Sequence, residues 1–328
     1  MITVFTPTYN RKENLKALYS SLLNQRENFE WVIVDDGSQD DTKEYVETLI
    51  KENKINIQYC YKENGGKPSA FNKGLELAKG QIFLCIDSDD ILENNILSII
   101  KEDFKEILDN NKICAIMYNQ GHIKNKTLIG KIFPEDNLVE NYYNVYNKYK
   151  VTGDKLIVFK TDIARKYPFP IIDNEKFIPE ALVYNRIAIN YNFLCKNKIA
   201  AYKEYLNNGY SNNYFELVKR NPKGNALYYK ELYNFNKYGL LLHYETYGDQ
   251  SQFLTIASMV KNEGWAPIPS ERLGAPFGRY LGTYSMFLLM NFEIILMKII
   301  SIFFENPSDI LQISYCMIFP ITAIISFY

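Results

Sequence analysis

Strand-like and helix-like segments alternate through the first 120 residues, and this alternation constrains the fold more than any other feature of the chain. Short runs of β-branched and aromatic residues predict strands, and apolar side chains three or four positions apart predict helices between them. The predicted strands are 2–6, 31–34, 55–61, 82–86 and 113–118, and the intervening helices begin near 10, 41, 66 and 92. Units that repeat in this way predict a parallel sheet with helices on both faces.

Length, charge and cysteine usage exclude several classes of protein. A chain of 328 residues is long enough for one or two domains. A net charge of -1 provides no broad basic field, so we expect no nucleic-acid partner. The five cysteines contain no CxxC pair, which favours reduced buried thiols over disulfides or zinc. The run 2–5 is too short for a signal-peptide core, which favours a cytoplasmic protein or one on the inner membrane face.

Acidic residues follow two of the predicted strands. Asp35 and Asp36 come after the second strand, and Asp87-Ser88-Asp89-Asp90 comes after the fourth. Ligands bind beyond the carboxyl ends of strands in an open parallel sheet, and neighbouring carboxylates repel one another unless a cation or a hydrogen-bonding ligand is present. Oxygen ligands without His or Cys favour Mg²⁺ or Mn²⁺. The alternative is that these residues are only helix caps and turn residues.

Four motifs in these positions carry a resemblance to a known family. The segments 6–11 (TPTYNR), 34–38 (VDDGS), 64–67 (NGGK) and 87–90 (DSDD) occur in order and with family-like spacing. Together they resemble the family-2 glycosyltransferases of the nucleotide-sugar-binding GT-A type. The resemblance is strong over 1–120, fair to about 240 and poor beyond. It implies an α/β fold of GT-A type, with a Rossmann-like, mostly parallel sheet flanked by helices.

The resemblance also implies which residues bind the nucleotide of the sugar donor. Pro7 and Tyr9 would lie against the base, and Asp35 would accept a hydrogen bond from its ring N–H. Asp36 would lie beside Asp35 and near the ribose.

The same resemblance assigns the diphosphate and sugar positions. Gly65 and Gly66 would let the backbone approach the donor, and Lys67 would offset negative charge on the phosphate or base side. Asp87 would bind the ribose or sugar, with Ser88 also among the donor-binding residues.

The resemblance makes Asp89 the metal ligand of the site. The expected cofactor is Mn²⁺ or Mg²⁺, which would stabilise the charge on the departing nucleotide diphosphate.

An inverting transferase also needs a base that takes a proton from the acceptor hydroxyl. The family places an acid six residues before an Arg at the start of a helix, and here Glu180 precedes Arg186 at that spacing. Pro179 stands where the family has a first acid, and Glu replaces the usual Asp. Glu180 is therefore the expected catalytic base, with Asp173 and Glu175 in reserve. The alternative is that Glu180 only complements a helix N-terminus.

The expected domain organisation has three parts. Residues 1–240 form a GT-A catalytic domain, with a nucleotide-sugar-binding half at 1–120 and an acceptor half at 121–240. Residues 241–278 form a linker or helical connection, and 279–328 form apolar helices. The charged residues within 279–328 argue against a simple membrane span, so this tail is expected to lie on the membrane, to pack internally or to mediate a dimer.

The function expected from these residues is transfer of a sugar, with inversion, from a nucleotide diphosphate to a hydroxyl of a glycan or lipid-linked acceptor in surface polysaccharide synthesis. A UDP-sugar is the expected donor. Two alternatives stay open, namely a sugar nucleotidyltransferase and a non-catalytic nucleotide-sugar-binding or membrane scaffold subunit. The segment 8–11 lacks the glycine-rich phosphate loop that a nucleotidyltransferase would have after its first strand.

Overall fold

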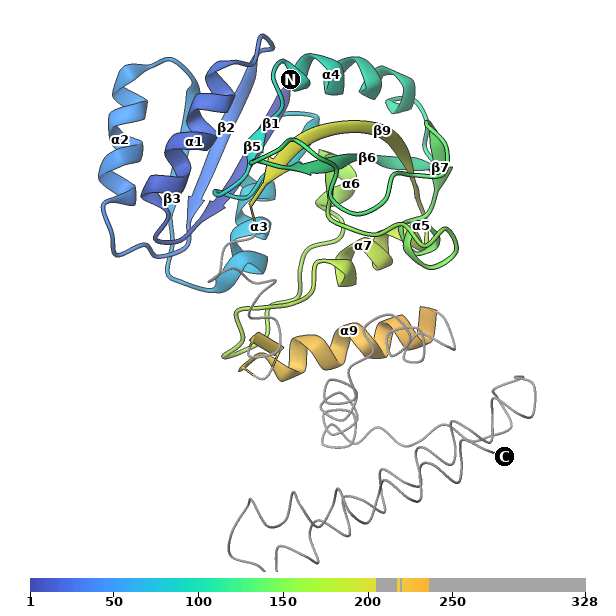
Figure 1. Cartoon of the computed structure of the whole chain (residues 1–328). Helices are drawn as coiled ribbons and strands as arrows, with labels where there is room; N and C mark the ends of the chain where they lie inside the picture. Colours follow the sequence, from blue (N-terminus) through green and yellow to red (C-terminus); the bar gives the residue numbers. More distant parts are fainter. Residues whose placement is uncertain (205–216, 219, 236–328) are drawn as a thin grey trace, which may run out of the picture. The chain divides into compact units, whose positions relative to one another are not determined.

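One nine-stranded sheet organises the part of the chain that the computed structural model describes, namely residues 1–204, 217–218 and 220–235 (Figure 1). The strand order is β3-β2-β1-β4-β8-β6-β9-β5, and β7 pairs with β9. The strands are β1 (Ile2–Thr8), β2 (Phe29–Asp35), β3 (Asn56–Tyr61), β4 (Ile82–Cys85), β5 (Ile91–Leu92), β6 (Ile113–His122), β7 (Leu138–Glu140), β8 (Lys155–Lys160) and β9 (Asn192–Lys203). The helices are α1 (Lys12–Leu23), α2 (Thr42–Glu52), α3 (Gly66–Leu77), α4 (Ile96–Ile107), α5 (Tyr142–Asn147), α6 (Thr161–Ala164), α7 (Ala181–Ala188) and α9 (Pro222–Phe235).

The first four strands are parallel, as the alternating pattern predicts. β1 pairs with β2 on one side and with β4 on the other, and β2 pairs with β3. In this register Thr8 lies opposite Asp35 at the carboxyl ends of β1 and β2. The loops that carry the predicted donor motifs therefore all leave the sheet at the carboxyl ends of its parallel strands.

The second half of the sheet corrects the expectation of a mostly parallel sheet. β8 lies between β4 and β6 and is antiparallel to both, whereas β6 and β9 are parallel. The apolar run of β8 is fully consistent with a buried strand, but a continuous apolar run contains no information on strand direction. The sheet is therefore mixed, with a parallel half followed by a half that contains both directions.

Two helical layers cover the sheet, as predicted. Alternating side chains of each strand point to opposite faces, so that Val4 packs in one layer and Phe5 in the other. Helices α1, α2 and α4 contribute to the first apolar layer, and α3, α5, α6 and α7 contribute to the second.

The helix and strand ends differ from the sequence-based expectations by a few residues. Leu92, expected to begin a helix, belongs to the short strand β5, and α4 begins at Ile96. The predicted segments 241–278 and 279–328 lie outside the described residues, so the domain boundaries and the apolar helical extension stay predictions. In the described ranges, we find no helix with the length and apolar character needed to cross a bilayer.

Candidate active site

The loops after β1 and β2 are joined by hydrogen bonds, which hold the predicted base-binding residues together. The Asn10 amide donates to Ser38 Oγ at 2.9 Å, and the Gln39 amide donates to Asn10 Oδ1 at 2.8 Å. Pro7 is partly buried within β1, and Tyr9 is 46% exposed at the end of this strand. Tyr9 thus offers an aromatic surface at the edge where ligands of parallel sheets bind.

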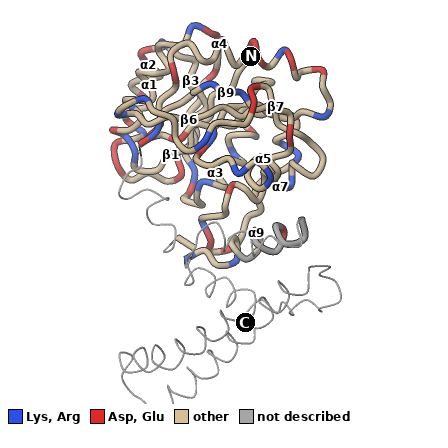
Figure 2. The backbone as a smooth tube through the Cα atoms, turned by 45° about the vertical axis from the view of Figure 1, so that its right-hand side comes forward, with Lys and Arg blue, Asp and Glu red and all other residues tan. Residues whose placement is uncertain are grey.

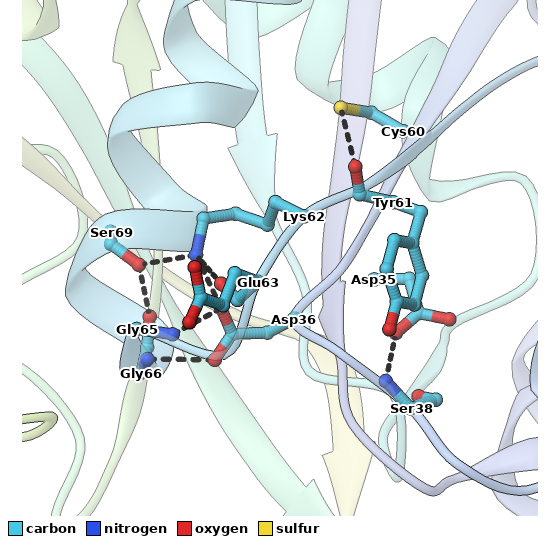
Figure 3. Close-up of polar contacts among 10 residues, drawn as sticks. All are labelled: Asp35, Asp36, Ser38, Cys60, Tyr61, Lys62, Glu63, Gly65, Gly66 and Ser69. Carbon is cyan, nitrogen blue, oxygen red and sulfur yellow. Dashed lines mark hydrogen bonds and ion pairs between the residues drawn. The ribbon is translucent and has the colours of Figure 1, made fainter.

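Asp35 is fully buried at the end of β2, and both of its carboxylate oxygens already accept hydrogen bonds. The Ser38 amide donates to Oδ1 and the Tyr59 hydroxyl donates to Oδ2, each at 2.7 Å. The bond to Ser38 is visible in Figure 3. Burial, and then the hydrogen bond to Asp35, raise the pKa of the Tyr59 hydroxyl, so it remains a donor at neutral pH. These bonds fix the carboxylate at the end of β2.

Asp36 joins the end of β2 to the loop that begins α3 (Figure 3). It is 4% exposed, and its Oδ1 lies 2.7 Å from Lys62 Nζ. The Gly65 amide donates to Oδ1 at 3.0 Å, and the Gly66 amide donates to Oδ2 at 2.7 Å. Asp36 therefore shapes the glycine loop, a task that the sequence alone did not suggest. Lys62 was also missed, because no local motif marks a lysine that pairs with an aspartate of the neighbouring strand.

Replacement of Asp36 by Asn is expected to lower the free energy of unfolding by about 2 kcal/mol or more. The Asn side chain has only one oxygen, so it cannot accept hydrogen bonds from both glycine amides. It also has no negative charge to pair with Lys62. Urea denaturation would measure the change. Asp41→Asn is the matched control, since Asp41 is exposed and paired with Lys12 on the surface. An Asp36→Asn variant as stable as Asp41→Asn would contradict the structural role of Asp36.

The acidic motif after β4 forms a tight turn in which the Asp90 amide donates to the Asp87 carbonyl at 3.1 Å. Asp87 and Asp89 are half-buried, whereas Ser88 and Asp90 are buried. Burial opposes ionisation of Asp87, but the positive charges of Lys67 and Lys203 lower its pKa. Burial, together with nearby carboxylates, raises the pKa of Asp90 well above its usual value, although Lys203 acts in the opposite direction.

The carboxylate oxygens at this turn suit a hard divalent cation that also binds phosphate. The Asp90 Oδ1 atom is buried without a hydrogen-bond partner, and the Asp89 carboxylate makes no hydrogen bond or ion pair within the described residues. No group of three or more His, Cys, Asp or Glu residues in the described ranges is arranged to hold a metal. A site with one or two protein carboxylates is how Mg²⁺ usually binds together with substrate phosphates.

Lys67 connects the acidic turn to the predicted base. It lies in the first turn of α3, and its Nζ is 2.5 Å from Asp87 Oδ1 and 2.7 Å from Glu180 Oε1. Burial alone would lower the pKa of Lys67, but the charges of Asp87 and Glu180 raise it well above the usual value. Residues from α3, the β4 turn and the start of α7 therefore meet at one ammonium group.

Glu180 precedes α7 without capping it. Its side chain forms no capping hydrogen bond, so Glu180 could complement the helix N-terminus only through its charge. Oε1 pairs with Lys67, and Oε2 accepts a long hydrogen bond of 3.4 Å from the Tyr184 hydroxyl. With 44% of its side chain exposed, Glu180 is accessible to a ligand beside the acidic turn.

The two reserve acids differ in their availability. Glu175 accepts hydrogen bonds from the Lys223 and Gly224 amides, both at 2.7 Å, and thereby caps the N-terminus of α9. Asp173 is exposed. Glu175 is thus engaged in holding α9, and Asp173 is the freer of the two.

Helix α9 supports the segment that leads to Glu180. Asn221 Oδ1 accepts hydrogen bonds from the Lys176 and Phe177 amides, at 2.7 and 3.1 Å. Arg186 of α7 forms a two-pronged pair with Glu231 of α9, with both N–O distances at 2.7 Å. Arg186, the arginine of the predicted motif, therefore orients α7 through α9. The spacing to Glu180 pointed to Arg186, but nothing local pointed to Asn221 or Glu231.

A family model described as glycosyl transferase family 2 matches residues 3–167, just over half of the 328 residues. The chain belongs to this family.

Curated relatives match a part of the chain. The glycosyltransferase GlyG of Streptococcus pneumoniae is 32% identical over 109 residues, which are 32% of this chain and 36% of that protein. The poly-β-1,6-N-acetyl-D-glucosamine synthase of Staphylococcus aureus is 34% identical over 133 residues, which are 40% of this chain and 31% of that protein. The matches thus span about a third of these relatives.

Solved structures show the same fold. TarS of S. aureus, residues 1–349 in complex with UDP-GlcNAc, aligns with a TM-score of 0.57 and 19% identity, covering 80% of each chain. The mannosyltransferase PcManGT of Pyrobaculum calidifontis, in complex with GDP-Man and Mn²⁺, aligns with a TM-score of 0.52 and 20% identity. That alignment covers 88% of this chain and 80% of PcManGT. The mixed sheet with helices on both faces is therefore of the type found in these transferases.

Proposed function

We propose that the protein is an inverting glycosyltransferase that moves a sugar from a nucleotide diphosphate, most simply a UDP-sugar, to a hydroxyl of a glycan or lipid-linked acceptor. The observation that carries this proposal is the meeting of Glu180, Lys67 and Asp87, which are distant in sequence, at one edge of the sheet. The family, and the UDP-GlcNAc bound to TarS, support a nucleotide-sugar donor.

The donor would lie across the carboxyl ends of β1, β2 and β4. In this pose Tyr9 stacks on the base, Pro7 lines the base pocket, and the fixed carboxylate of Asp35 accepts a hydrogen bond from the base. The loop at Gly65 and Gly66, held by Asp36, brings backbone close to the donor. These contacts orient the sugar before reaction.

The leaving diphosphate would lie at the acidic turn. In this proposal Asp87 and Ser88 bind the ribose or sugar, and Asp89 would hold Mn²⁺ or Mg²⁺. When bound, such a cation stabilises the negative charge that the leaving diphosphate gains. The Mn²⁺ in the PcManGT complex supports this assignment.

Glu180 would act as the base on the acceptor side. Its carboxylate takes the proton from the acceptor hydroxyl as that oxygen attacks the sugar carbon from the side opposite to the diphosphate, which inverts the configuration. Two contacts keep Glu180 in place, namely its hydrogen bond with the Tyr184 hydroxyl and the contact of α7 with α9.

The acceptor and the location follow from the expected cellular role. We propose a function in bacterial surface polysaccharide or wall glycan synthesis, which the polysaccharide synthase among the relatives supports. Reaction in the cytoplasm or at the cytoplasmic membrane face suits a nucleotide-sugar donor, and an apolar tail at 279–328 could bring the enzyme to a lipid-linked acceptor. Figure 2 shows basic and acidic segments interspersed along the described backbone, and the proposal includes no nucleic-acid partner.

A panel of UDP- and GDP-sugars tests the proposed function. We expect Mn²⁺-dependent donor hydrolysis or transfer that chelation removes, and we expect Asp89→Ala to lower it by about tenfold or more, since one metal ligand is lost. Asp109→Ala, at an exposed carboxylate after α4, is the control and should retain wild-type turnover. Metal-dependent pyrophosphate release from a nucleoside triphosphate and a sugar phosphate would instead indicate a nucleotidyltransferase. Donor binding without any turnover would favour a scaffold subunit.

A further inference from the structure

One ammonium group is shared between the donor side and the acceptor side of the site. Lys67 Nζ contacts Asp87 of the turn proposed to hold the donor and Glu180, the proposed base, at 2.5 and 2.7 Å. The three side chains are 22%, 33% and 44% exposed, so a ligand can reach this group. One oxygen of Glu180, Oε1, is therefore engaged by Lys67.

We propose that the diphosphate of the donor competes with Glu180 for Lys67, so that donor binding frees the base for the acceptor hydroxyl. This inference rests on the proposed function and concerns how its site is regulated. It predicts an ordered reaction in which the donor binds before the acceptor.

Charge and geometry favour such an exchange. A diphosphate presents several phosphate oxygens to Lys67, even when a divalent cation offsets part of its charge, whereas Glu180 presents one carboxylate. An ammonium is a compact charge on a flexible stem that can turn toward a new partner. Lys67 lies in the first turn of α3, directly after the glycine loop that would approach the donor. When Lys67 moves, the Tyr184 hydroxyl still contacts Glu180 Oε2, so the carboxylate stays in place while Oε1 becomes able to accept a proton.

The alternative is that Lys67 holds Glu180 permanently, and this alternative predicts a different response of donor affinity. If Lys67 held Glu180 as a permanent support, loss of the Glu180 charge would only reduce repulsion of the nucleotide, and the gain in affinity would persist without Lys67. If Lys67 is instead released from Glu180 during binding, removal of that charge eliminates a cost of binding and donor affinity rises. The affinity of variants for the nucleotide alone therefore separates the two arrangements without any catalytic turnover.

The test is calorimetric titration with UDP and Mn²⁺, and with UMP and Mn²⁺, of the full chain. Glu180→Gln is expected to tighten UDP binding about two- to fivefold, the range for one partly exposed ion pair, and to tighten UMP binding less because UMP lacks the second phosphate. Asp173→Asn is the matched control, since it removes an equal charge from an exposed residue of the same segment. It should change UDP affinity less than Glu180→Gln does.

A double-mutant cycle of Lys67 and Glu180 completes the test. In a Lys67→Met background, Glu180→Gln should no longer tighten UDP binding, because the shared ammonium is gone. The proposal is overturned if Glu180→Gln leaves the affinity for UDP unchanged or weakens it, or if Asp173→Asn raises that affinity equally. It is also overturned if Glu180→Gln raises the affinity for UMP as much as that for UDP. Failure of the wild-type chain to bind any nucleotide would instead contradict the proposed function, so the two failures are distinguishable.

Discussion

Glu180→Gln is expected to lower the rate of sugar transfer by about 10²–10⁴-fold while nucleotide binding is retained, because an amide cannot take the proton from the acceptor hydroxyl. The substitution keeps the size of the side chain and its place before α7. Its effect should therefore fall on kcat with the acceptor saturating. Initial rates with the identified donor, together with the calorimetric affinity for UDP, measure the two quantities separately.

Asp173→Asn is the control for this experiment, because Asp173 is the available reserve acid while Glu175 caps α9. We expect Asp173→Asn to retain transfer. If Glu180→Gln retains transfer and Asp173→Asn loses it, the base is Asp173. Loss of nucleotide binding in Glu180→Gln would assign Glu180 to the donor rather than to the acceptor.

Gly66→Ala is expected to lower the free energy of unfolding by about 3 kcal/mol or more and to abolish nucleotide binding. Gly66 has a φ of +83°, which side-chain-bearing residues rarely adopt, and an added Cβ would overlap the carbonyl oxygen of Lys176. Both the donor loop and the segment before Glu180 would have to move. Urea denaturation and calorimetric titration with UDP would measure the two effects.

Gly65→Ala is the matched control in the adjacent position. There an added Cβ would approach Ser69 Oγ at 2.7 Å and Lys62 Nζ at 3.1 Å, and both atoms are ends of side chains that can turn away. We expect the free energy of unfolding to fall by about 1 kcal/mol or less. Similar stability of the two variants would show that the close contact between Gly66 and Lys176 does not constrain the site.

The parallel half of the sheet and its acidic edge were predictable because their signals are local. Each strand from β1 to β4 is a short run rich in β-branched or aromatic residues. The residues that follow these runs must lie at one end of the sheet once the strands are parallel. Asp35, Asp36 and Asp87 could therefore be placed together from the sequence. The direction of β8 could not, because an apolar run has the same composition in either direction.

Partners that are remote in sequence were not predictable from local patterns. The expectation that Asp36 lies near the ribose stays a prediction, and the structure shows that its carboxylate binds the Gly65 and Gly66 amides and Lys62. The sequence left Glu175 as a reserve candidate for the base, and the structure shows its carboxylate bound to the start of α9. In each case an acidic residue matched a motif or a segment, and only the packing of another element showed what it contacts.

For this protein the sequence determined the family, the order of the first strands and helices, and the acidic residues that end those strands, because each depends on neighbouring residues along the chain. The tertiary structure decided how those residues are used. It brought Lys67 between Asp87 and Glu180, which are separated by the whole of β6 to β8, and it bound α7 to α9 through Arg186 and Glu231. Such contacts depend on how the elements pack, and the packing energy of distant elements leaves no local pattern in the chain.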